Sequence, residues 1–166
     1  MSLRKPKYRQ LSTDELQELE KEFVHYLIVN GITAEDWGRL KEDELEKAED
    51  ILTLFSDVVL EGVLIKINFL EFRSNNDIKV FQCLKDKIVM VGLTSDNPEI
   101  DFTRQDIINN AGTISPKGLK AYTLSKSYQK PREEELFHLI SNGCQISDSK
   151  LFKSISLALM NLNIGE

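Results

Sequence analysis

The sequence has few of the residues that most often carry enzyme chemistry. Its 166 residues include two histidines, two cysteines and one tryptophan. There is no C-x-x-C pair, no glycine-rich phosphate loop and no G-x-S-x-G element. These absences exclude the common nucleotide-binding and serine-hydrolase motifs, and no motif that is present fixes a chemistry.

The histidines and cysteines are also too scattered for a metal centre. His25, His138, Cys83 and Cys144 include no pair with the short ligand spacing of a structural zinc site, so we expect no metal and no cofactor. Both histidines project opposite their apolar neighbours on a helical wheel, which predicts solvated side chains. Both cysteines are expected to be buried free thiols, as in a reducing compartment.

Long apolar runs are missing as well. The best candidate, Val58 to Leu70, is interrupted by Glu61, Lys66 and Asn68, and it is shorter than the roughly 18 residues that cross a bilayer. The N-terminal residues are basic and lack the apolar segment of a secretory signal. We therefore expect a cytoplasmic protein with no membrane partner.

Charge is plentiful but unevenly distributed. The net charge is −6 and the pI is about 5.1, yet residues 1–10 carry four bases and no acid, which predicts a basic arm. Acids greatly outnumber bases from Asp14 to Glu61. The dense acidic run from Glu42 to Asp50 has carboxylates that can bind a divalent cation, but the solvated face of an amphipathic helix accounts for it more simply.

A second basic stretch, from Lys117 to Arg132, contains no acid and is interleaved with tyrosines. This composition is used to follow a phosphate backbone and to stack bases. The alternatives are a solvated loop and a complement to the acidic helix of this or a partner molecule. The candidate polyanion-binding residues are Lys117, Lys120, Tyr122, Lys126, Tyr128, Lys130 and Arg132.

Apolar periodicity predicts helices before residue 68. A capping-box pattern at Ser12 to Glu15 starts a first helix, which Asn30-Gly31 ends, and Thr33 starts a second. A break is expected near Lys41 to Asp43, and the following long helix should end near Asn68. These elements amount to a helical hairpin.

The next segments predict a three-stranded antiparallel β-meander. Phe69–Arg73, Ile78–Leu84 and Ile88–Leu93 are rich in β-branched and aromatic residues, and the breaks between them are too short for a crossover. The first and third segments are the candidate sheet edges, which are either covered or recruit a partner.

The C-terminal part predicts helices that close the core. A short helix is expected from Thr103 to Gly112, another from Pro131 to Asn142, and a last one capped by Ser147. Residues 113–130 are expected to form a flexible basic segment. With no linker composition anywhere, the chain reads as a single α+β domain over residues 1–166.

The chain resembles small bacterial proteins of an uncharacterised family, a domain of unknown function. The resemblance lies within Glu46 to Leu93, especially in Leu54–Val59, Phe69–Ser74 and Ile78–Phe81. It implies a bacterial, cytoplasmic origin and brings no activity, ligand or site with it.

These observations favour a non-enzymatic protein-interaction or regulatory protein. Its contacts to a protein partner or to a second copy would use the acidic helical face, a sheet edge or the basic segment. One alternative is binding of nucleic acid or another polyanion through residues 117–132. Another is a small enzyme whose site is assembled from distant residues.

Overall fold

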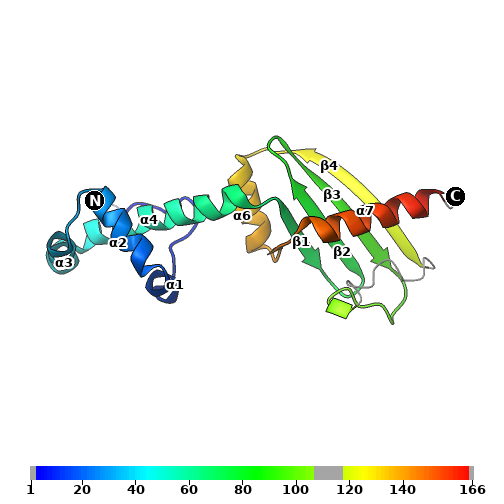
Figure 1. Cartoon of the computed structure of the whole chain (residues 1–166), viewed down its shortest axis with the longest axis horizontal. Coiled ribbons are helices and arrows are strands. Elements are labelled where there is room, and N and C mark those ends of the chain that lie inside the picture. The colour runs from blue at the N-terminus through cyan, green and yellow to red at the C-terminus, as the bar shows by residue number, and fades with distance from the viewer. Residues whose placement is uncertain (1–2, 107–117, 165–166) are drawn as a thin grey trace. The chain divides into compact units, whose positions relative to one another are not determined.

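A computed structural model describes residues 3–106 and 118–164, with side chains up to Leu162. The chain divides into two compact units, Met1–Ile65 and Lys66–Glu166, which are considered separately below. The first unit is helical and the second contains an antiparallel sheet with helices, so the predicted α+β class is confirmed (Figure 1). That the whole chain folds as a single domain stays a prediction.

The described residues of the first unit form helices rather than a simple hairpin. The predicted first helix is divided at Leu19, whose backbone (φ −101°, ψ 22°) departs from helical geometry. The predicted capping box at Ser12 and the predicted helix start at Thr33 are confirmed. Thr33 also forms a capping box with Asp36, and the expected break lies at Glu44. The helices are α1 (Thr13–Glu18), α2 (Glu20–Val29), α3 (Ala34–Asp43) and α4 (Leu45–Lys66).

Aromatic side chains hold these helices together. The Phe23 ring lies 5.1 Å from that of Trp37 on α3 and 4.9 Å from that of Phe55 on α4, both in edge-on arrangements. Tyr26 also packs on Phe55, at 5.4 Å. Such pairs add about 0.5–1.5 kcal/mol each beyond the burial of their area. Phe23 therefore links three helices.

The basic arm lies along α4 and is held by that helix's polar side chains. The Lys7 ammonium pairs with Glu61 at 3.1 Å, and the Tyr8 hydroxyl donates to the same carboxylate. The Tyr8 hydrogen bond is the main cause of the lowered pKa of Glu61. Backbone N–H groups of the arm also donate to α4, from Arg4 to Asp50 at 2.9 Å and from Lys7 to Asp57 at 2.8 Å. Just after the arm, the Leu11 N–H donates to the Ser56 hydroxyl at 3.0 Å.

The sheet of the second unit has five strands among the described residues, in the order β4-β3-β2-β1-β5, all antiparallel. The predicted meander is confirmed as the centre of this sheet. The predicted number of three strands is wrong, because β4 and β5 add one strand at each side. The strands are β1 (Phe69–Arg73), β2 (Asp77–Cys83), β3 (Lys87–Ser95), β4 (Leu119–Ser127) and β5 (Gln145–Ile146).

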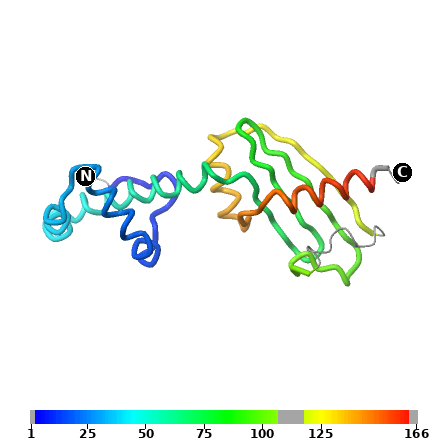
Figure 2. Tube along the Cα trace, viewed as in Figure 1, coloured from blue at the N-terminus to red at the C-terminus, as the bar shows by residue number. Residues whose placement is uncertain are grey.

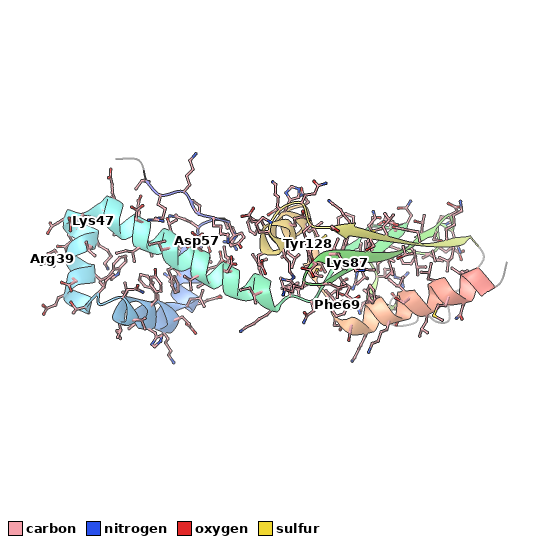
Figure 3. All side chains as sticks on the ribbon, turned by 90° about the horizontal axis from the view of Figure 1, so that it is seen from above. Arg39, Lys47, Asp57, Phe69, Lys87 and Tyr128 are labelled. Carbon is pink, nitrogen blue, oxygen red and sulfur yellow. The ribbon has the colours of Figure 1, made fainter. Side chains whose placement is uncertain are left out.

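One face of the sheet is covered by α7 (Ser149–Ile164), as Figure 3 shows from the side. The predicted apolar stripe of this helix is confirmed, although Asp148 rather than Ser147 caps it, accepting from the N–H groups of Lys150 and Leu151. We call this side the α7 face. Its buried cluster consists of Ile78, Val80, Val91, Leu93, Phe102, Leu151 and Ile155.

The predicted helix after Pro131 is α6 (Arg132–Ser141), whose Leu136 is fully buried. The chain leaves α6 through Gly143, which has a left-handed φ of 108° and faces the Phe72 ring. Most of the predicted helix from Thr103 to Gly112 lies outside the described residues. No helix among the residues that the structure describes is long and apolar enough to cross a membrane.

Gly92 on β3 makes room for an aromatic ring on the face opposite α7. It pairs in register with Tyr122 on β4, and a Cβ atom at Gly92 would overlap the Cζ, hydroxyl and Cε2 atoms of that ring. The ring cannot swing aside freely, because its hydroxyl donates to Asp77 on β2 at 2.5 Å. A glycine at this place allows the ring to lie across β3 and tie β4 to β2.

We expect Gly92→Ala to lower the free energy of unfolding by about 1–3 kcal/mol, since it displaces the Tyr122 ring from its hydrogen bond. Urea denaturation measures this change. Gly62→Ala is the matched control, because nothing lies within 4 Å of its Cβ position and alanine favours a helix by up to about 1 kcal/mol. The same substitution is also made in a Tyr122→Ala protein. If Gly92→Ala lowers the free energy of unfolding as much there as in the wild type, the coupling between Gly92 and the Tyr122 ring is contradicted.

Candidate functional site

The basic segment contains the free edge of the sheet. Leu119–Ser127, where the sequence predicts no strand, pairs along its whole length with β3 and forms β4. Figures 1 and 2 show β4 at the margin of the sheet. Sequence reasoning misses this strand because Leu119, Tyr122 and Leu124 make only a thin apolar face, and most of its residues, Leu124 included, are exposed.

The predicted edges are therefore wrong. Ile88–Leu93 lies within β3, between β2 and β4, and Phe69–Arg73 is β1, which pairs with both β2 and β5. At the far side the edge strand β5 is only two residues long, Gln145–Ile146. Among the described residues, β4 is the one long edge strand.

The ladder determines which backbone groups of β4 face outward. The Ser95 N–H donates to Asn76 O at 2.9 Å, so the backbone groups of odd-numbered β3 residues bond to β2. The Asp96 N–H donates to Gly118 O at 3.2 Å, so the backbone groups at even-numbered positions bond to β4. Bonding direction alternates along an antiparallel strand. The N–H and C=O groups that point away from the sheet therefore belong to Leu119, Ala121, Thr123, Ser125 and Ser127.

The side chains of β4 alternate in the same way. Leu119 and Ala121 pack toward α7, so Lys120, Tyr122, Leu124 and Lys126 lie on the opposite face. The two lysines are exposed and flank Leu124, which is itself 65% exposed. Three of the predicted polyanion-binding residues are thus brought together on one face.

Tyr122 is part of a hydrogen-bonded cluster on this face. The Asp77 carboxylate accepts from the Tyr122 and Thr94 hydroxyls at 2.5 and 2.9 Å, and pairs with the Lys79 ammonium at 3.0 Å. Burial opposes ionisation of Asp77, but its three partners outweigh burial, and its pKa is lowered. Burial and the neighbouring carboxylate raise the pKa of Tyr122.

The remaining candidates of the basic segment have other positions. Lys117 lies outside the described residues. The Tyr128 hydroxyl donates to Leu84 O at 2.8 Å, and burial raises its pKa to about 12. Lys130 is exposed, while its backbone N–H donates to the Glu135 carboxylate.

Arg132 has a structural position. Its guanidinium donates to three main-chain carbonyls, those of Ile67 before β1, Cys83 at the end of β2 and Leu84 in the following turn, the last two at 3.1 and 3.2 Å. Only 14% of its side chain is exposed. The guanidinium therefore ties the start of α6 to the meander and is not presented to a ligand.

The other residues considered from the sequence are arranged as follows. His25 and His138 are both exposed, as predicted, and the described residues hold no group of three or more His, Cys, Asp or Glu side chains able to bind a metal. Cys83 and Cys144 are free and buried, as predicted. Burial raises the pKa of both thiols, that of Cys83 to about 11.

Replacement of Arg132 tests its structural position. We expect Arg132→Ala to lower the free energy of unfolding by about 2–4 kcal/mol, because three carbonyls lose a charged donor. Lys130→Ala, two residues away and exposed, should change it by less than about 0.5 kcal/mol. Wild-type stability of Arg132→Ala in urea denaturation would contradict this assignment.

The Asp77 cluster predicts a dependence of stability on pH. The folded-state pKa of Asp77 lies below its ordinary value of 3.8, so the ionised carboxylate stabilises the fold at pH values above 3.8. This stabilisation is lost as the pH falls through the folded-state pKa. Asp77→Asn should cost about 1 kcal/mol at neutral pH. In urea denaturation, the difference in free energy of unfolding between wild type and Asp77→Asn should become smaller below about pH 4. A difference that does not change with pH would exclude the ionised carboxylate as its cause.

Comparison with known proteins agrees with the resemblance noted in the sequence. Residues 3–160 match a family of unknown function (DUF6495). No curated protein and no solved structure matches the chain. The chain belongs to this family of unknown function, DUF6495.

Proposed function

We propose that this is a non-enzymatic interaction protein, which binds an extended, acidic segment of a partner protein along β4. The observation that carries the proposal is the nine-residue edge strand itself. Its outward N–H and C=O groups have no strand beside them among the described residues. A partner strand would continue the ladder with main-chain hydrogen bonds.

Charge selects the partner. Lys120 and Lys126 are exposed on the same face of β4, and no acidic residue lies between them in the sequence. Because their backbone groups bond to β3, the partner residues opposite them would form non-hydrogen-bonded pairs, in which side chains approach most closely. Acidic residues six positions apart in the partner segment would therefore meet the two lysines.

The same geometry disfavours a second copy as the occupant. Full-length antiparallel pairing of β4 with β4 of another molecule would place Lys120 opposite Lys126 at two symmetric positions. Like charges directly opposite each other destabilise a strand pair. An acidic strand removes this repulsion and replaces it with attraction.

The test uses a labelled nine-residue peptide of alternating Thr and Val with Glu at its second and eighth positions. We expect it to bind with an affinity that falls as salt is added, and a peptide with Lys at those positions to bind at least about ten-fold more weakly. N-methylation of the peptide on its ladder-forming residues should abolish binding. Fluorescence anisotropy provides the affinities.

One variant separates a protein partner from a nucleic acid, and a second tests the two lysines. Ser125→Pro removes one outward N–H and spares the ladder to β3, so it should abolish peptide binding. Lys120→Glu with Lys126→Glu should weaken binding of both the peptide and a poly-uridine RNA. RNA binding that survives Ser125→Pro, together with no peptide binding to wild type, would replace this proposal with the polyanion alternative.

A further inference from the structure

A polar pocket lies on the α7 face, away from the outer edge of β4. It has a volume of about 280 Å³, and its walls come from β1, the segment after β3 that contains Gln105, the segment between β5 and α7, and the first turns of α7. This volume is near the lower end of the range of ligand pockets, roughly 300–1,000 Å³. The lining residues are Glu71, Arg73, Gln105, Ser147, Asp148, Lys150, Leu151 and Ser154.

The buried side-chain atoms that lack a hydrogen-bond partner among the described residues all belong to this pocket. They are Glu71 Oε2, Arg73 Nε and Ser147 Oγ. A buried polar group without a partner costs about 1–3 kcal/mol, and proteins seldom keep one without a use for it. Glu71 Oε2 and Arg73 Nε form an ion pair with each other, whereas Ser147 Oγ has neither an ion pair nor a hydrogen bond within the described part of the chain. A buried hydroxyl without a partner beside a buried ion pair indicates polar groups that a ligand would complete.

Glu71 and Arg73 project side by side because they are two residues apart on β1. Arg73 Nε and Glu71 Oε2 form an ion pair with each other, and neither atom has a hydrogen bond to a residue that the structure describes. The Glu71 side chain is only 10% exposed. The Glu71 carboxylate is therefore largely removed from bulk solvent, and a donor in the pocket would give it a further partner besides Arg73.

The other polar groups of the pocket complete its charge pattern. The Asp148 carboxylate is occupied as the cap of α7, accepting from the N–H groups of Lys150 and Leu151. The main chain of Ser147 is held beside β1, because its N–H donates to Phe69 O at 2.9 Å. Arg73 Nη1 donates to Gln105 Oε1 at 3.5 Å, and Arg73 Nε pairs with Glu71. The unused lone pairs of the Glu71 carboxylate, the other N–H groups of Arg73 and the ammonium of Lys150 remain for a ligand.

From this pattern we infer that the pocket binds a small zwitterion of the size of a free amino acid. The ammonium of the ligand donates to Glu71 Oε2, and its carboxylate accepts from Arg73 and Lys150, with Ser147 as a further contact. A simple anion would meet the buried Glu71 carboxylate, and a simple cation would meet Arg73. The site is independent of the proposed peptide binding at β4, and it adds a small-molecule ligand to the protein.

The test titrates the full-length protein with the standard L-amino acids at millimolar concentration, observed by isothermal calorimetry and by ¹⁵N–¹H NMR. We expect at least one to bind and to shift amides of residues 71–73 and 147–151. The N-acetyl and amide derivatives of that amino acid each lack one charge and should bind at least about ten-fold more weakly. Failure of all the amino acids to bind, or equal binding of either derivative, would overturn the inference.

Variants assign the contacts. Ser147→Ala and Lys150→Ala should each weaken binding, and Glu71→Gln should weaken it at least about ten-fold. Lys153→Ala is the matched control, because Lys153 is an exposed lysine of the same helix that does not line the pocket. If Glu71→Gln fails to fold, the comparison of Lys150→Ala with Lys153→Ala decides. Equal ligand affinity of Lys150→Ala, Lys153→Ala and Ser147→Ala would overturn the site.

Discussion

The two-residue alternation of the antiparallel ladder is the constraint on which the second unit depends. Side-chain direction and hydrogen-bond direction both reverse at each residue, so one register fixes both. With Val80 opposite Val91, the apolar residues of the inner strands meet under α7. The same register directs the odd-numbered backbone groups of β4 outward and leaves Lys120 and Lys126 on the other face. The core and the free edge of the sheet thus follow from one arrangement.

Basic residues of the same stretch have different roles once the chain is folded. Arg132 and Lys130 belong to the same basic stretch, yet the Arg132 guanidinium binds main-chain carbonyls and the Lys130 side chain is exposed. Arginine suits the first role because its planar fork reaches several acceptors at once and it stays charged when partly buried. The charge available to a partner is therefore carried by lysines.

Polar burial distinguishes the two proposed sites. At β4 the polar groups are solvated backbone and lysine head groups, so binding would exchange water for a partner strand, and salt would weaken it. In the pocket of Glu71, Arg73 and Ser147 the polar atoms are already removed from water and lack full pairing. Because folding has already removed these groups from water, binding a ligand there would not have to desolvate them again. This lower cost of binding is the general advantage of a preorganised site.

The sequence by itself determined the local elements. Capping boxes at Ser12 and Thr33, the three central strands and the stripe of α7 all depend on neighbouring residues, and all are in the structure. Tertiary structure alone decided the sheet edges and the sites. Strand β4 is held by long-range pairing with β3, and Glu71 and Ser147 line one pocket because β1 pairs with β5. Such long-range contacts leave no periodic signal in the sequence.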